Sequence, residues 1–347
     1  MAKVFDNLYK DIVDFSNLYQ AWRKAAKGKR KSMAVASFEM NLSDELICLQ
    51  NELKNRTWQA GQYQSFTIRD PKKRLVSAAP FRDRVVHHAL CNVTESIYEN
   101  TFIGDSFANR KGKGTHAALD KAQVYMRRFP YVLQCDLKQF FPSVDHAVME
   151  SVLNRKIIDV DTRWLMRSIL KSGEGIHPSV GVFNGNKPHG LPIGNLTSQF
   201  WANVLLNELD QFVKRNLGCK GYLRYVDDFL LFSDSKKELW EWKLAISAKL
   251  KKLKLQMHQQ SSTVYPVATG VPFLGFRLYP NHRRLKRKNG VNFQRRLQRY
   301  YGEYQRSDLS REALNMRVQG WVAHASKADT WGLRRSLLSA SLPLRVL

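Results

Sequence analysis

The chain has 347 residues, and its 56 Lys and Arg against 30 Asp and Glu give a formal net charge of +26 at pH 7. Hydrophobic residues make up 44%, which excludes a disordered chain and suits two or three small lobes around a shared core. So basic a protein calls for a polyanionic partner, and nucleic acid leads, because Lys and Arg contacts to phosphates dominate its non-specific binding. A basic protein that is merely soluble, or that touches anionic membrane, is the alternative.

Cysteine spacing and hydropathy exclude further classes of protein. The four cysteines are far apart and form no Cys-X-X-Cys pair, which argues against a zinc ribbon and against a disulfide framework. We find no signal peptide and no run of about 18 apolar residues that could span a membrane. We therefore expect no membrane partner and a cytoplasmic location.

The first third of the chain alternates basic and apolar segments. Residues 22–32 form a basic cluster that is either a phosphate-binding arm or a solvated charged face. Ser43 is a candidate N-cap, because Leu46, Leu49 and Leu53 follow it at helical spacing. Up to residue 128 the pattern predicts a helix over 43–55, extended segments over 62–70 and 74–78 joined by a basic turn at Pro71, Lys72 and Lys73, and helices over 83–98 and 115–128.

The middle of the chain places acids at the ends of apolar runs. Residues 131–136 form a short apolar run that ends in Asp136, which is typical of a core strand with a carboxylate at its edge. Residues 221–234 are two apolar runs around Asp227 and Asp228, which predicts a β-hairpin with both acids at its tip. We further expect helices over 146–154, 162–171, 197–215 and 236–252, an irregular segment over 173–195, short strands near 255–258 and 273–278, and a basic helical tail from Arg283. This order of elements predicts an α+β fold with an antiparallel sheet backed by helices.

The acids form the candidate catalytic group. An Asp-Asp pair in a turn is weak evidence by itself, because Asp is common in turns. Adjacent carboxylates repel each other, however, and a divalent cation relieves that repulsion. Two-metal phosphoryl transfer needs carboxylates from separate strands to converge, and Asp136 supplies the second strand. We therefore predict that Asp136, Asp227 and Asp228 bind two metal ions, one at the attacking hydroxyl and one at a triphosphate.

Five segments resemble the motifs of reverse transcriptases, in the order of that family. The first catalytic motif reads YVLQCDLKQFFPSVDH, and the Tyr-X-Asp-Asp box reads RYVDDFLLF. The template- and nucleotide-binding motif between them reads GLPIGNLTSQFWANVLLNELD. An Arg-Lys-Gly segment like that of group II intron-like enzymes reads SFANRKGKGTHAAL, and a primer-grip strand reads VPFLGFRL. The resemblance covers about residues 60–280 and implies an RNA-directed DNA polymerase with a right-hand fold of fingers, palm and helical thumb.

The resemblance also implies lobes and residue roles. The N-terminal segment and fingers, with part of the palm, would span 1–130, the palm 131–280 with a fingers-side insertion near 160–195, and the thumb 281–347. The three acids would bind two Mg²⁺ ions, for which Mn²⁺ can substitute, together with the backbone carbonyl of Leu137. Phe141 would be the steric gate that excludes a 2′-hydroxyl, and its alternative role is a core aromatic.

Two further sets of residues follow from the resemblance. The nucleotide-binding set comprises Lys72, Arg74, Phe141, Ile193, Gly194 and Gln199. The nucleic-acid-binding set comprises Arg110, Lys111, Lys113, Tyr225, Phe273, Gly275, Arg295, Arg296 and Arg299.

The motif at residues 193–199 indicates a subfamily. Group II intron, retron and retroviral-like enzymes usually have Gln-Gly-X-X-X-Ser-Pro there, whereas this chain has Ile-Gly-Asn-Leu-Thr-Ser-Gln. That pattern resembles the reverse transcriptases of diversity-generating retroelements, prokaryotic enzymes that copy a template RNA with errors opposite adenines. The implied partners are a structured template RNA, a cDNA/RNA duplex, dNTPs and a small basic helical-bundle accessory protein, pentameric in the family. The segment 177–190 is longer than is usual in the family.

Other interpretations remain open. One is another prokaryotic reverse transcriptase, of retron, group II intron or defence-associated type. Another is a non-catalytic RNA-binding protein with a polymerase fold, against which the three intact acids argue. A zinc-dependent nuclease lacks support, because the nine histidines are scattered. We expect no RNase H, DNA-binding or endonuclease module beside the polymerase.

Overall fold

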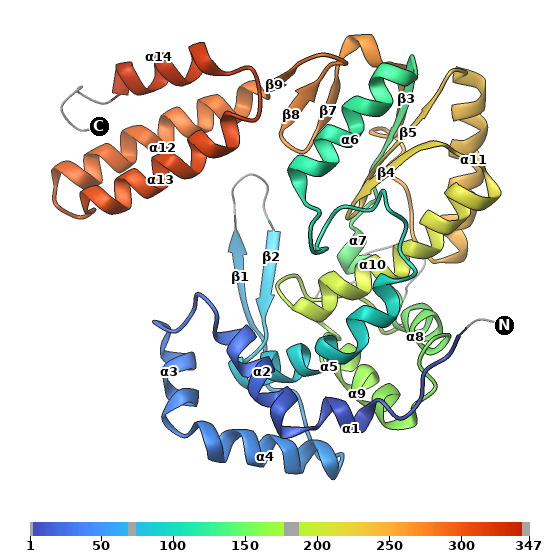
Figure 1. Cartoon of the computed structure of the whole chain (residues 1–347), viewed down its shortest axis with the longest axis vertical. Coiled ribbons are helices and arrows are strands. Elements are labelled where there is room, and N and C mark those ends of the chain that lie inside the picture. Colours follow the sequence, from blue (N-terminus) through green and yellow to red (C-terminus); the bar gives the residue numbers. More distant parts are fainter. Residues whose placement is uncertain (1–2, 69–73, 177–186, 342–347) are drawn as a thin grey trace.

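The computed structural model describes residues 3–68, 74–176 and 187–341. Its elements follow one another as an N-terminal group of helices, a central antiparallel sheet with covering helices, and a C-terminal group of helices (Figure 1). This confirms the predicted α+β architecture. No helix in the described ranges combines the length and apolarity needed to cross a bilayer.

The N-terminal helices pack around one long central helix, α5 (Phe81–Glu99). They are α1 (Tyr9–Ile12), α2 (Phe15–Ala26), α3 (Met33–Met40) and α4 (Leu42–Lys54). Asp14 caps α2 by accepting hydrogen bonds from the amides of Ser16 and Asn17. The predicted helix over 43–55 is therefore α4, but its N-cap is Asn41, and the prediction of Ser43 was wrong. The basic cluster at 22–32 begins inside α2, whose last turn carries Arg23 and Lys24.

A two-stranded antiparallel ribbon leaves this helical group. It consists of β1 (Gln64–Ile68) and β2 (Arg74–Ala78), as the extended segments predicted. In Figure 1 the ribbon points from the N-terminal helices toward the C-terminal ones. The predicted basic turn at Pro71, Lys72 and Lys73 lies outside the described residues.

The central sheet has four antiparallel strands in the order β4-β5-β3-β6. They are β3 (Tyr131–Cys135), β4 (Gly221–Tyr225), β5 (Asp228–Ser233) and β6 (Thr263–Pro266). The strand expected near 255–258 was wrong, because only Met257 forms a bridge there, to Leu137, and the continuous strand is β6.

Each face of this sheet packs on a different helix. Side chains alternate between the two faces of a strand, so Leu133 and Leu231 join one core with α11 (Lys236–Lys252), whereas Val132 and Leu230 join another with α6 (Thr115–Arg128). The connections supply α7 (Phe140–Ser143), α8 (His146–Asn154) and α9 (Val160–Lys171). The predicted helix over 197–215 is α10 (Leu196–Gln211), which continues as the π-helical turn η1 (Phe212–Asn216).

The C-terminal part begins with a small sheet and ends in three helices. A 3-10 turn, η2 (Val267–Thr269), precedes β7 (Val271–Phe273), β8 (Phe276–Leu278) and β9 (Arg283–Leu285). The strand expected over 273–278 is thus split by a turn, and Arg283 starts a strand rather than a helix. The helices α12 (Arg287–Gln305), α13 (Arg311–Ala325) and α14 (Trp331–Ser341) enclose their own core, in which the rings of Phe293 and Trp321 stack 3.8 Å apart.

Candidate active site

The predicted catalytic acids lie at one end of the central sheet. Strands β3 and β5 pair Cys135 with Phe229, so the next step of the register sets Asp136 opposite Asp228. Strands β4 and β5 pair Tyr225 with Asp228, which leaves Val226 and Asp227 as the turn between them. Opposite residues of an antiparallel pair lie about 4.5–5.5 Å apart and on the same face. The structure therefore brings carboxylates from two separate strands together, with Asp227 in the adjacent turn.

The same geometry has a chemical consequence. All three acids are partly exposed, and like charges set opposite each other on a sheet are destabilising. Alternation along the strands places Asp136 and Asp228 on the face that carries Val132 and Leu230. A cation bound between them would remove the repulsion, so this strand end suits a positively charged ligand.

The donor set fits an open magnesium site. Within residues 3–68, 74–176 and 187–341, no three or more His, Cys, Asp or Glu side chains are arranged to hold a metal ion by themselves. Mg²⁺ is commonly held by one or two carboxylates, and substrate phosphates and water complete its coordination. The opposed pair Asp136 and Asp228 can supply the carboxylates. The neighbouring bridge between Leu137 and Met257 is formed through the carbonyl of Asp136 and the amide of Lys138. These hydrogen bonds do not involve the carbonyl of Leu137, which is the predicted backbone ligand of the metal.

Backbone hydrogen bonds tie the loop that precedes α10, which contains Ile193 and Gly194, to Phe141 and to β2. The Leu191 amide donates to the Phe141 carbonyl at 2.8 Å, which ties this loop to α7. The Ser77 amide donates to the Ile193 carbonyl at 2.9 Å, which ties the loop to β2. The loop thus connects the steric-gate candidate to the β1–β2 ribbon.

Gly194 follows at a φ of +129°, and a β-carbon there would lie 3.1 Å from the carbonyl oxygen of Ser77. Only glycine allows both this conformation and this close approach. The Phe141 side chain is half-buried against the core and meets Phe140 edge-on at 5.2 Å. Gln199 is exposed in the first turn of α10, and Arg74 is exposed at the start of β2. Lys72 lies outside the described residues.

Sequence reasoning missed the residues that support this loop. The Asn195 amide side chain donates to the Tyr63 hydroxyl at 2.7 Å, and that hydroxyl lies 3.2 Å from the Ser172 hydroxyl. Burial raises the pKa of Tyr63, so it stays a neutral phenol. The sequence contained only a weak signal for this role of Asn195, because a polar residue directly before a helix is usually interpreted as its N-cap. In the structure the Asn195 side chain forms no capping hydrogen bond.

Arg110 does not occupy the position expected of a phosphate ligand. Its guanidinium donates to the Glu99 carboxylate at 2.7 Å and to the carbonyls of Ile103 and Ser106, and its side chain is only 7% exposed. These contacts fasten the loop after α5, which argues against the predicted role in nucleic-acid binding. The neighbouring Lys111 is exposed, as phosphate contact requires.

The remaining nucleic-acid-binding candidates differ in accessibility. Lys113 is exposed, although its ammonium donates to the Gly104 carbonyl, and the Tyr225 hydroxyl lies 3.0 Å from that of Thr115. Phe273 is 1% exposed, and its ring packs in the same core as residues of α6, so only its backbone is left for the contact predicted of a primer-grip strand.

The turn after Phe273 anchors the C-terminal helices. The carbonyl of Gly275 accepts hydrogen bonds from the Lys286 amide and from the Asn289 side chain, both at 3.1 Å. On α12, Arg295 and Arg299 are exposed and Arg296 is partly buried. The exposed pair can reach a polyanion.

Comparison with known proteins now identifies the family. Residues 68–278 match the sequence model of the family described as reverse transcriptase (RNA-dependent DNA polymerase). The chain belongs to the reverse transcriptase family. This membership, together with the mixed helices and antiparallel sheet, confirms the predicted right-hand polymerase fold and the predicted enzyme class, an RNA-directed DNA polymerase.

Several relatives of this reverse transcriptase share its sequence at low identity. The protein YkfC of Escherichia coli is 27% identical over 72% of this chain and 74% of its own length. The group II intron-encoded protein LtrA of Lactococcus lactis is 27% identical over 61% of this chain, and the match spans 36% of LtrA. The putative COX1/OXI3 intron 2 protein of Saccharomyces cerevisiae is 24% identical over 73% of this chain, and the match spans 30% of its own length. Among solved structures, an apo telomerase of Candida tropicalis overlaps 68% of this chain and 59% of its own, with a TM-score of 0.49 and 13% identity.

Proposed function

We propose that this reverse transcriptase copies a structured template RNA into mutagenic, adenine-directed cDNA for a diversity-generating retroelement. The observation that carries the polymerase chemistry is the opposition of Asp136 and Asp228 at the strand ends, with Asp227 in the turn between β4 and β5. The observation that supports the mutagenic role is the apolar Ile193 where related enzymes usually have Gln.

The three acids would hold two divalent ions, proposed as Mg²⁺, with Mn²⁺ as a substitute. When bound, the ions supply charge neutralisation at the transferred phosphate and activation of the attacking hydroxyl. The chain's own residues position the reactants: Phe141 lies under the sugar as a steric gate, and Arg74 contacts the triphosphate through its planar guanidinium. Exposed Arg295 and Arg299 on α12 contact backbone phosphates of the product duplex.

The mutagenic part of the proposal rests on the pocket around Ile193. The carbonyl of Ile193 accepts from the Ser77 amide, and its side chain is partly exposed, so we propose that the side chain contacts the incoming base pair. An aliphatic side chain offers apolar contact alone, whereas an amide could donate and accept hydrogen bonds. Discrimination that depends on hydrogen bonds is stronger than discrimination by shape alone. A pocket without that amide should therefore misincorporate more.

The lobes and partners are proposals as well. We propose an N-terminal segment and fingers over 1–130, a palm over 131–280 and a thumb over 281–347, and the separate core of α12–α14 supports the last of these. A net charge of +26 supports binding to RNA and to a cDNA/RNA duplex. The small basic accessory protein is proposed on the resemblance alone, since two basic proteins do not attract each other. A group II intron-type enzyme is the second candidate, because LtrA and the yeast relative carry intron names.

The test is primer extension on an RNA template with dNTPs and Mg²⁺, followed by sequencing of the cDNA. Asp227→Asn should abolish synthesis, and Ile193→Gln should lower errors opposite adenine. Leu196→Gln is the matched control, because it introduces the same amide at an exposed position of the same motif. Faithful synthesis by the unmodified chain would reject the mutagenic role and leave the intron-type alternative. Adenine errors that are unchanged in Ile193→Gln would reject the account based on Ile193. No synthesis even with cognate RNA and accessory protein would favour a non-catalytic RNA-binding protein.

A further inference from the structure

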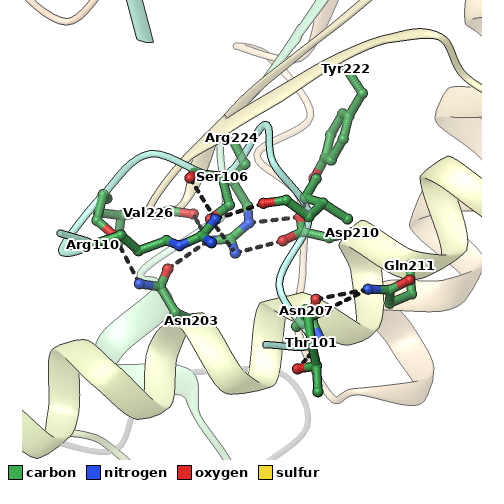
Figure 2. A network of polar contacts seen from close by, with 12 residues as sticks. Thr101, Ser106, Arg110, Asn203, Asn207, Asp210, Gln211, Tyr222, Arg224 and Val226 are labelled. Carbon is green, nitrogen blue, oxygen red and sulfur yellow. Dashed lines mark hydrogen bonds and ion pairs between the residues drawn. The ribbon is translucent and has the colours of Figure 1, made fainter. Parts of the chain in front are cut away.

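A fully buried ion pair lies beneath the turn that carries the catalytic acids. Figure 2 shows Arg224 of β4 beside Asp210 of α10. Both side chains are 0% exposed. The guanidinium grips the carboxylate with two hydrogen bonds, Nε to Oδ1 at 2.8 Å and Nη2 to Oδ2 at 2.7 Å. The Tyr222 hydroxyl donates to Oδ1 at 2.7 Å. The carboxylate is therefore well satisfied, and the remaining donors of the guanidinium are directed elsewhere.

One of those donors reaches the turn itself. The Nη1 group of Arg224 donates to the carbonyl of Val226 at 3.0 Å and to Asn203 at 3.1 Å, and its Nη2 group donates to Ser106 at 3.1 Å. The Val226 carbonyl belongs to the planar peptide that continues into Asp227. Fixing this oxygen therefore fixes the orientation of the peptide from which the Asp227 carboxylate extends.

The turn needs such support because its backbone is strained. Val226 has a φ of +54°, a left-handed conformation that is rare for β-branched residues and costs on the order of 1–3 kcal/mol. Strain of this kind persists only where the surroundings determine the conformation. Alternation along β4 places Arg224 on the face of Tyr222, opposite to the face of the acids. Arg224 can thus hold the turn from behind without entering the metal site.

The pair also links the turn to the rest of the site. Asp210 and Asn203 belong to α10, which begins directly after the Ile193–Gly194 loop. The backbone of β4 is fixed too, since the Arg224 amide donates to the Asp105 carbonyl at 2.9 Å and the Phe107 amide donates to the Arg224 carbonyl at 3.0 Å. Burial alone would lower the pKa of Arg224, but Asp210 raises it, so the guanidinium stays charged.

We propose that Arg224, clamped by Asp210, is a positioning residue that orients the Val226–Asp227 peptide for metal binding and catalysis. This inference rests on the proposed two-metal role of Asp136, Asp227 and Asp228. A buried ion pair is weak evidence for stability, because apolar residues of similar volume often replace such pairs without loss. What an apolar pair cannot do here is donate to the Val226 carbonyl.

The test exploits this difference with the double variant Arg224→Met/Asp210→Leu, which removes both charges and leaves neither unpaired. Arg155→Met is the control. It removes an ion pair between Arg155 and Glu208 of α10, whose charged atoms lie 2.8 Å apart and which is more exposed than the Arg224–Asp210 pair. We expect the double variant to unfold at a lower temperature than the wild type, because the buried Tyr222, Asn203 and Ser106 side chains lose partners. Assayed below that temperature, it should lose about 10- to 100-fold in kcat, as small misplacements of catalytic groups do. Its half-saturating Mg²⁺ concentration should rise several-fold, and backbone amides at 225–229 should exchange hydrogen faster in the metal-free protein. The control should change none of these.

Arg224→Lys serves as the second variant should the double variant fail to fold. It keeps the buried charge but has no planar fork, so it should shift kcat, Mg²⁺ dependence and hydrogen exchange in the same direction by a smaller factor. A folded variant with wild-type values of all three, tested beside an inactive Asp227→Asn, would overturn the inference and leave the proposed function intact. An active Asp227→Asn would instead overturn the proposed function.

Discussion

Gly194 is a position where a single methyl group should damage the proposed nucleotide pocket. Its φ of +129° is disfavoured for any other residue, and an alanine β-carbon would lie 3.1 Å from the Ser77 carbonyl oxygen and 3.3 Å from a methyl of Val76. The conformation costs an alanine about 1–3 kcal/mol. Relief by displacement of the loop would break the bond from the Ser77 amide to the Ile193 carbonyl, which adds about 0.5–1.5 kcal/mol. We expect Gly194→Ala to lower the free energy of unfolding by about 2–4 kcal/mol and to raise the KM for dNTP.

Chemical denaturation gives the stability, and steady-state primer extension gives the KM. Gly218→Ala is the control, because Gly218 also has a positive φ, +64°, but no atom lies within 4 Å of its added β-carbon. It should lose only the left-handed penalty, about 1–2 kcal/mol, with the KM unchanged. Equal losses of stability in the two variants, or an unchanged KM in Gly194→Ala, would refute the reasoning about the close approach.

Three further predictions concern acid sensitivity, salt dependence and sugar selection. Burial lowers the pKa of His87 to about 3, so the unfolded chain binds the proton first and stability falls as the pH drops from about 6.5 toward 3. His87→Leu should remove about 2 kcal/mol of the loss between about pH 7.5 and pH 5, measured by denaturation at both pH values. Arg295→Ala should lower the slope of log affinity for RNA against log salt concentration by about 1. Arg110→Ala should leave that slope unchanged, because Arg110 binds Glu99 rather than phosphate. It should instead lower the free energy of unfolding by about 1.5–3 kcal/mol. Phe141→Ala should raise incorporation of ribonucleotides relative to deoxynucleotides in single-turnover extension, and an unchanged ratio would mean that the ring only packs in the core.

The sequence was a good guide to the acid-tipped strands. The segments that end in Asp136 and surround Asp227 are short and apolar, and each has a charged residue at its end. These properties can be recognised from neighbouring residues alone. The long helices were found for the same reason, since their apolar spacing repeats over several turns. The opposition of Asp136 to Asp228 could be expected in outline, but the register that establishes it depends on pairing between residues about ninety positions apart.

The sequence was a weaker guide where distant contacts decide the environment of a residue. Arg110 lies in a basic, glycine-rich loop that reads as a phosphate site, yet its partners are Glu99 and loop carbonyls. Phe273 ends a short strand that resembles a primer grip, but the packing of α6 buries it. Arg224 did leave a signal, because it is a charged residue within the otherwise uncharged strand β4, and such residues are rarely buried unless they are paired. Asp210 left none, because it stands beside other polar residues near the end of α10.

The pairing of Arg224 also answers an electrostatic problem in the site. An uncompensated guanidinium beneath the turn would attract the carboxylates of Asp227 and Asp228 and compete with a cation for them. Because Asp210 binds it through two short hydrogen bonds, the buried unit is neutral as a whole, and the field of a neutral pair falls off faster with distance than that of a single charge. The guanidinium can therefore fix the Val226 carbonyl while the repulsion between Asp136 and Asp228 stays uncompensated by it. That repulsion is what a divalent cation would relieve on binding, so the buried carboxylate of Asp210 lets Arg224 hold the turn without competing with the cation for the acids.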